Sequence, residues 1–413
     1  MELTLDVDTS ASSSTESYRD SCSAAALDQR SQVDTYMYSV LTLPDEIVSE
    51  IFLQYTPPYP LHPPLRGEGS PTHLTQICRR WRSIAHNTPQ LWQAIRLYDT
   101  EESYGQDILV AESWLQRSCS LPLSIILLEG VFSCSFRENA QARARGAALP
   151  LLLKHKARWE YVMLNYASSA RGAGAIYPLG SLPALRSIRF VQGRHGEDLF
   201  NIAESPWDAP NLRRAAFNCN WQANEHIPKS LTARVISRSL SAVLPQLTHL
   251  YLDHISESIN HIPQILQQTL SLVHCWLDFE TPERNFSWTS DVIHLDHLQS
   301  LALLGSTSAD GALPFLHQLR TPQLRYLLVH EPMFKFRRRS NTDSESESLG
   351  EVVDSLGAVE SLRALHILRA RFPKAYYQEK FPRISSIVLD SYPFLSPSAV
   401  GGWEFWSRRQ WVL

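Results

Sequence analysis

Residues 245–253, with the sequence PQLTHLYLD, and residues 322–330, with the sequence PQLRYLLVH, follow one pattern of apolar positions. In the first stretch Leu247 is followed by Leu250 and Leu252. Side chains two residues apart in a strand point to the same face. We therefore expect Leu250 and Leu252 to share one face of a short strand, with Leu247 entering the same core from the preceding bend. A single strand cannot bury such a face, so the pattern predicts one unit of a larger sheet.

The same spacing recurs along the chain beyond residue 90. Successive units begin 22 to 38 residues apart, and four of them open with a proline two residues before the first leucine, at Pro183, Pro210, Pro245 and Pro322. Stacked units of this kind form a continuous parallel sheet with a continuous apolar core. The predicted units are Trp92/Ile95/Leu97, Leu123/Ile126/Leu128, Trp159/Val162/Leu164, Leu185/Ile188/Phe190, Leu212/Ala215/Phe217, Leu247/Leu250/Leu252, Leu272/Cys275/Leu277, Leu298/Leu301/Leu303, Leu324/Leu327/Val329, Leu362/Leu365/Ile367 and Ile384/Ile387/Leu389.

This repeat resembles a degenerate leucine-rich repeat, a family with units of roughly 20 to 29 residues. The resemblance implies an α/β solenoid over residues 98–400, an irregular leucine-rich-repeat horseshoe with a parallel sheet. Residues 230–243 and 258–268 are expected to form helices on its outer side. No asparagine recurs after the strands, so irregular curvature is expected. An ordinary α/β domain is the alternative interpretation.

Residues 41–55, LTLPDEIVSEIFLQY, predict a helix ahead of the repeats. Pro44 suits the first helical position, and Asp45 and Glu46 suit the first turn because the helix dipole favours negative charge there. The apolar residues expected on one face of this helix are Ile47, Val48, Ile51, Phe52 and Tyr55.

Residues 71–97, PTHLTQICRRWRSIAHNTPQLWQAIRL, predict a second helical segment that ends before Pro89, since a residue preceding proline avoids the helical conformation. The stretch as a whole thus predicts two or three short amphipathic helices. Such helices cannot bury their apolar faces alone, so we expect them to contact another protein. The apolar stripe of this segment is Leu74, Ile77, Cys78, Trp81, Ile84 and Ala85.

Three runs of this region, LPDEI at 43–47, CRRWRSIA at 78–85 and TPQLW at 88–92, resemble the F-box in its fungal form. The resemblance implies a small helical module over residues 39–97 that binds the Skp adaptor of a cullin-type ubiquitin ligase. One departure is a proline-rich insertion at residues 54–70, where shorter F-boxes have a brief turn. The resemblance implies adaptor contacts at Leu43, Pro44, Ile47, Ile51, Leu74, Cys78 and Trp81.

Three further segments stand outside the repeat pattern. Residues 1–38 are rich in serine and acids and predict a disordered tail. Residues 335–349 predict a disordered charged loop, with a nuclear signal or a phosphorylated loop as the alternatives. Residues 401–413 carry Trp403, Phe405, Trp406 and Trp411 and predict an aromatic cap on the end of the sheet, or a tail that binds a partner.

The residues between the inward leucines are expected on the concave surface, where neighbouring strands bring them into rows. Tyr and Trp anchor protein interfaces while fixed polar groups select a partner, so we predict a seat for a protein substrate there. The alternative is that these aromatic side chains only cover the sheet. The predicted substrate-binding residues are His249, Tyr251, Asp253, His274, Trp276, Asp278, Tyr326 and His330.

Composition narrows the remaining classes of function. The chain has 38 basic and 42 acidic residues, which argues against a nucleic-acid-binding surface. It has neither a run of roughly 18 to 20 apolar residues, which a membrane span needs, nor a secretory signal, so a cytoplasmic or nuclear location is expected. The 6 cysteines form no CxxC pair and the 15 histidines no HExxH motif, so no metal or cofactor is predicted. The sequence contains no nucleophile motif or phosphate-binding loop that would predict an enzyme.

Two hypotheses follow. In the first, the chain is a non-catalytic substrate receptor: the helical module binds the Skp adaptor and the repeats hold the substrate. In the second, it is a leucine-rich-repeat scaffold without ligase association, and the helices only seal the end of the repeats. Adaptor binding requires an apolar face within residues 43–85 that the repeats leave uncovered.

Overall fold

The structure is a computed structural model and describes residues 42–98, 103–128, 147–166, 179–192, 206–218, 240–255, 262–279, 292–305, 316–334 and 348–390. In these residues eleven strands form one parallel sheet in which each strand pairs with its neighbours in the order below. The predicted α/β architecture with a large parallel sheet is confirmed. The strands are β1 (Ala94–Tyr98), β2 (Leu123–Leu128), β3 (Trp159–Tyr166), β4 (Ser187–Gln192), β5 (Arg214–Asn218), β6 (His249–Ile255), β7 (His274–Phe279), β9 (Ser300–Gly305), β11 (Tyr326–His330), β12 (Ala364–Leu368) and β13 (Ser386–Asp390).

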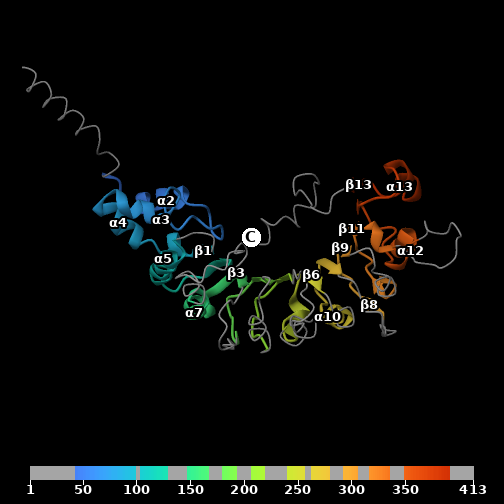
Figure 1. Cartoon of the computed structure of the whole chain (residues 1–413), viewed down its shortest axis with the longest axis horizontal. Coiled ribbons are helices and arrows are strands. Elements are labelled where there is room, and N and C mark those ends of the chain that lie inside the picture. The colour runs from blue at the N-terminus through green and yellow to red at the C-terminus, as the bar shows by residue number, and fades with distance from the viewer. Residues whose placement is uncertain are drawn as a thin grey trace, which may run out of the picture.

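The strands follow one another along an arc, with helices on its outer side and at both ends (Figure 1). The outer side carries α5 (Tyr104–Arg117), α7 (Ala148–Leu153) and α10 (Ile262–Gln268). A short parallel pair, β8 (Ile293–His294) and β10 (Leu319–Arg320), lies apart from the main sheet. The N-terminal end holds α2 (Asp45–Tyr55), α3 (Pro71–Ile77), α4 (Arg79–His86) and the 3-10 turn η3 (Pro89–Trp92); the C-terminal end holds α12 (Ser348–Ser355) and α13 (Lys374–Lys380). The remaining 3-10 turns are η4 (Lys156–Arg158), η5 (Leu244–Gln246) and η6 (Glu331–Phe334).

A tight turn places the first leucine of most units. The backbone N–H of Leu185 donates to the carbonyl of Leu182, and that of Leu324 donates to Thr321. The repeated proline of the sequence, Pro183 or Pro322, is the second residue of this turn, where its fixed φ is suitable. The same bond recurs at Leu212, Leu247, Leu272 and Leu298.

Two rows of inward side chains build the core beneath the sheet. One row passes through Val162, Ile188 and Ala215, and the register pairs them strand by strand. The second row lies two residues further along each strand, so it points to the same face. The main apolar cluster runs without a break from Val48 in α2 to Ile387 in β13. The helical module and the sheet therefore share one core.

The predicted unit at β2 is displaced by one residue. Ile125 pairs with Ile95 and Leu127 with Leu97, so the inward residues are Ile125 and Leu127 rather than Ile126 and Leu128. A shift of one residue turns every side chain of a strand to the opposite face. The cause is the spacing after Leu123, because the register between β2 and β3 shifts there and leaves one extra residue on β3.

The predicted second helical segment is two helices. Cys78 has an extended backbone, with φ −152° and ψ 169°, and separates α3 from α4. Its sulfur accepts a hydrogen bond from the N–H of Trp81, so it caps α4. The first helix also starts one residue later than predicted, since Pro44 is the capping residue and Asp45 the first helical one.

Several predicted segments lie wholly or partly outside the described residues. These are the tail at 1–38, the aromatic segment at 401–413 and most of the loop at 335–349. That loop was predicted too long, because α12 already begins at Ser348. Of the outer helices, α10 covers the end of 258–268, and most of 230–243 is not described. The described helices include none with the length and apolar character that crossing a membrane requires.

Candidate functional site

Helix α2 is apolar on two sides, and only one of them enters the core. Val48 and Phe52, one turn apart, are 2% and 0% exposed. Ile47 and Ile51, one residue earlier in each turn, are 49% and 46% exposed, and Tyr55 is 39% exposed. Residues four apart lie on the same side of a helix, so these three side chains form one strip along α2.

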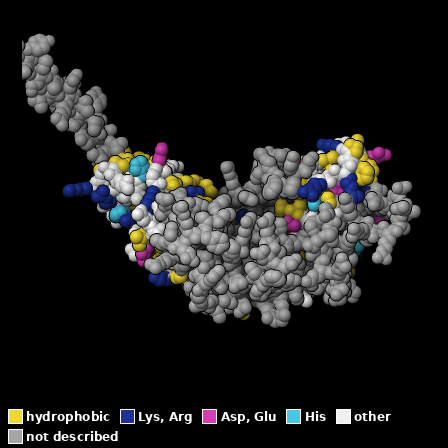
Figure 2. Space-filling model, in the orientation of Figure 1, with side chains coloured by type: hydrophobic (Ala, Val, Ile, Leu, Met, Phe, Trp, Pro, Cys, Tyr) yellow, Lys and Arg dark blue, Asp and Glu magenta, His cyan; other side chains and the backbone are white. Residues whose placement is uncertain are grey.

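We call Pro44, Ile47, Ile51 and Tyr55 the exposed helical face. Pro44 is exposed beside the first turn of α2. Figure 2 shows hydrophobic side chains gathered on the upper side of the helical module, where Figure 1 places α2. Ile77, the last residue of α3, is a further exposed apolar side chain at 52%. Exposed apolar side chains that lie next to one another are common on surfaces that bind another protein.

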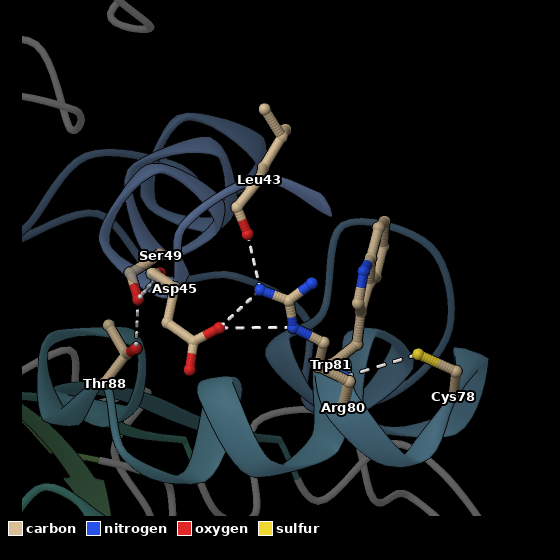
Figure 3. A network of polar contacts seen from close by, with 7 residues as sticks. All are labelled: Leu43, Asp45, Ser49, Cys78, Arg80, Trp81 and Thr88. Carbon is tan, nitrogen blue, oxygen red and sulfur yellow. Dashed lines mark hydrogen bonds and ion pairs between the residues drawn. The ribbon is translucent and has the colours of Figure 1, made fainter. Parts of the chain in front are cut away.

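A polar network fixes the start of α2 against α4 (Figure 3). The Arg80 guanidinium donates to the Leu43 carbonyl through Nη2 and contacts Asp45 Oδ1 through Nη2 at 2.7 Å and through Nε at 3.2 Å. One turn further along the same side of the helix, the Thr88 hydroxyl donates to Ser49 Oγ at 3.2 Å. These contacts hold one side of α2 along its first two turns, so the exposed helical face has a defined direction.

Aromatic packing between α2 and α4 also supports this helix. Trp81 of α4 lies edge-on to Phe52, with ring centroids 5.0 Å apart. Trp81 is itself half-buried, and Cys78 beside it is half-buried too. Both therefore serve the packing and capping of the helices and leave only part of their surface for a partner.

The predicted adaptor-binding residues divide into three groups. Pro44, Ile47 and Ile51 are exposed, whereas Leu43, Cys78 and Trp81 are half-buried. The assignment of Leu74 is wrong for a contact residue, because this side chain is 3% exposed and belongs to the core. Tyr55 and Ile77 are exposed as well but were not predicted as contacts, although both belong to the predicted apolar stripes.

The predicted substrate seat lies on the face of the sheet that points away from the main core. We call this face, formed by the side chains of the eleven strands that point away from the main core, the open face. In one row His249 pairs with His274, and two residues further Tyr251 pairs with Trp276. The predicted neighbours are therefore brought together.

An aromatic stack lies at the middle of the open face. The rings of Tyr251 and Trp276 are 5.0 Å apart and nearly parallel, at 21°, and the Arg189 guanidinium lies 5.9 Å from the Tyr251 ring centroid. Trp276 is 6% exposed and Tyr251 is half-buried. They belong to a second apolar cluster, separate from the main core, which also contains Ala216, Ala302, Leu328, Leu368, Leu304 and Tyr326.

Two histidines lie beside this cluster. The rings of His249 and His274 are 4.8 Å apart, and His249 Nδ1 lies 2.7 Å from the Thr248 hydroxyl. Burial, together with the nearby His274 and Arg214, lowers the pKa of His249 to about 3. Burial also lowers the pKa of His274 to about 4. Both rings are therefore neutral near pH 7.

We expect acid to destabilise the fold through this pair. The pKa of each folded histidine lies below the unfolded value of 6.5, so the unfolded chain binds protons first and stability falls as the pH drops from 6.5 towards 4. One pKa unit corresponds to about 1.4 kcal/mol, and solvent screening reduces the loss for His274 to about 1–2 kcal/mol. Urea unfolding of the wild-type chain and a His274→Asn variant at about pH 7 and about pH 5 measures this. An equal loss of stability in both chains would contradict the prediction.

Four predicted seat residues differ from expectation or lie away from the aromatic stack. Asp253 was expected beside Asp278, but the register shifts between Leu252 and Ile255, so the ladder does not pair them. The side chain of Asp253 is outside the described part of the structure, and Asp278 is half-buried. Tyr326 is half-buried at the rim of the second cluster. His330 is 7% exposed, with Nδ1 bonded to the Gly305 carbonyl.

Among the described residues, no three His, Cys, Asp or Glu side chains come together in a way that could hold a metal ion. Models of known protein families give no match to the chain, and neither do curated proteins.

Proposed function

We propose that this chain is a non-catalytic substrate receptor of a cullin-type ubiquitin ligase. In this proposal α2, α3, α4 and η3 are an F-box that binds a Skp adaptor and, through it, the cullin scaffold. The sheet and its outer helices are an irregular leucine-rich-repeat horseshoe that holds a protein substrate. The observation that carries the proposal is the exposed helical face.

The exposed helical face fits a docking role because several contacts fix α2 in an orientation that keeps this face exposed. Val48 and Phe52 bury one side of α2, and Arg80 ties its first turn to α4. Ile47 and Ile51 nevertheless remain about half exposed. An amphipathic helix that lays such a strip into an apolar groove is a common mode of protein recognition.

The open face is the proposed seat of the substrate. Its half-buried members Tyr251, Leu304 and Tyr326 are the apolar side chains of the second cluster that a bound protein would touch first. Tyr and Trp are the residues most often found at energetic centres of interfaces. Ubiquitin transfer would then be accelerated by proximity, with the chemistry supplied by other subunits. The proposal includes no cofactor, nucleic acid or membrane, and places the chain in the cytoplasm, the nucleus or both.

The proposal is tested by mixing the purified chain with a purified Skp adaptor. Gel filtration is expected to show one complex containing both, for the wild-type chain and for a Tyr251→Ala, Trp276→Ala variant. In cells with an inhibited proteasome, the variant should lose the proteins that co-purify with the wild-type chain. Absence of an adaptor complex would reject the ligase role, whereas an unchanged set of co-purifying proteins would reject the substrate seat.

One observation favours a second function, a protein-interaction scaffold without ligase association. The helical module shares its core with the sheet and directly precedes β1, the strand at one edge of the sheet. End units of repeat proteins commonly have a sealing role. This role explains the buried side of α2 but not the exposed one, so it stands second.

A further inference from the structure

The proline-rich insertion between α2 and α3, residues 56–70, packs against the sheet. We call these residues the clamp loop. The Tyr59 hydroxyl donates to Glu160 Oε2 at 2.8 Å, and the Tyr59 ring lies edge-on to Tyr161 at 5.9 Å. Glu160 and Tyr161 belong to β3, far from the helical module in sequence.

A second contact ties the loop to β2. The Ser124 hydroxyl donates to the Pro60 carbonyl at 2.9 Å and lies 3.0 Å from His62 Nε2. A serine hydroxyl has one hydrogen to donate, so His62 is the donor in the second bond. Ser124 is completely buried, and burial lowers the pKa of His62 to about 4. His62 is therefore neutral near pH 7 and keeps this bond.

These contacts lie on the open face. Ile125 and Val162 point into the main core, so their neighbours Ser124 and Tyr161 point the other way. The charge of Arg96 on β1 also lowers the pKa of His62. The clamp loop thus lies on the open face of β2 and β3.

A third attachment reaches the opposite side of the sheet. Arg66 Nε pairs with Asp107 Oδ1 at 3.1 Å, and Arg66 Nη1 donates to Gln106 Oε1 at 3.1 Å. Both partners are in the first turn of α5, whose Trp114 packs on Trp92 at 5.3 Å within the main core. The loop takes the required path because Gly67 and Gly69 both have φ +77°, which glycine adopts without strain.

We propose that the clamp loop fixes the helical module, and with it the exposed helical face, in one orientation relative to the open face of the sheet. The module is held from both faces of the sheet: by the aromatic core on one face and by the clamp loop, which contacts β2 and β3, on the other. Attachment through the core alone would hold the module from one face only. Under the proposed function, on which this consequence rests, the clamp loop sets the direction in which a substrate faces the rest of the ligase. Because the clamp loop occupies the first part of the open face, only the open face from β4 onward remains for the substrate.

The test measures orientation directly and needs no adaptor. Spin labels on genetically encoded non-natural residues replace Ser83 in α4 and Pro210 before β5, both of them exposed. Electron–electron resonance should give one narrow distance distribution for the wild-type chain. A Tyr59→Ala, His62→Ala, Arg66→Ala variant should lose the narrow distance and give a broad distribution. A Pro58→Ala, Glu68→Ala variant changes exposed residues of the same loop and should keep it.

A narrow distribution in the triple variant would overturn the proposal. Should the triple variant fail to fold, a Tyr59→Phe, Ser124→Ala variant removes the hydrogen bonds to Glu160, Pro60 and His62 while keeping the side-chain volume. It is expected to broaden the distribution less, and an unchanged width there would equally overturn the proposal. Adaptor affinity should stay unchanged in all variants, so loss of the clamp and failure of the proposed function give different results.

Discussion

An Ile47→Asp, Ile51→Asp variant is expected to bind a Skp adaptor at least about 100-fold more weakly than the wild-type chain. Burial of one large aliphatic side chain contributes about 1.5–3 kcal/mol, so two of them supply about 3 kcal/mol or more. The introduced carboxylates add a desolvation penalty at an apolar interface. Titration calorimetry with the purified adaptor measures the change.

Both substitutions lie on the exposed side of α2, so the fold should tolerate them. Exposed positions usually change the free energy of unfolding by less than about 0.5 kcal/mol. The matched control is Leu109→Asp on α5, a leucine that is 63% exposed and lies outside the exposed helical face. Equal affinities for the double variant, the control and the wild-type chain would remove the basis of the ligase proposal.

A Trp114→Ala variant is expected to lose about 3–5 kcal/mol of unfolding free energy, the usual range for removing a buried tryptophan. Trp114 is 0% exposed, packs edge-on against Trp92 at 5.3 Å and donates from Nε1 to the Thr72 hydroxyl at 3.1 Å. It thus joins α5, η3 and α3 at one point. Folded proteins are stable by only about 5–15 kcal/mol, so the loss is large.

Urea unfolding followed by circular dichroism measures this loss, with Trp114→Phe as the control. Phenylalanine keeps an aromatic ring against Trp92 but not the hydrogen bond to Thr72, so a smaller loss is expected. Because the main cluster extends from Val48 to Ile387, the helical module and the neighbouring strands should unfold together. A first transition confined to the module, with the sheet unaffected, would contradict the shared core.

The strands were predictable because their signal is local. Each unit needs two inward side chains two residues apart, and the turn before it favours proline, so Pro183, Leu185 and Ile188 alone indicate a strand. The error at β2 shows the limit of such a pattern: Ile125, Ile126, Leu127 and Leu128 are all apolar, and only pairing with β1 and β3 decides which ones face the core.

The candidate site was less predictable because it depends on contacts that are distant in sequence. The apolar stripe of α2 contains both Val48 and Ile47, and packing against α4 decides which is buried. Leu74 and Ile77 also belong to one predicted stripe. In the structure, Cys78 ends α3, the helix that contains both residues, and separates it from α4. The clamp loop is beyond sequence reasoning, since Tyr59 meets Glu160 across 101 positions of chain.

The strand order of the sheet means that the number of repeat units sets its length. Every strand pairs only with the units before and after it, so inserting or deleting one unit changes the length without altering the path of the rest. Each unit adds about 4.8 Å, the spacing between neighbouring strands. The distance between the two ends of the sheet can therefore change in steps, as single units are duplicated or lost.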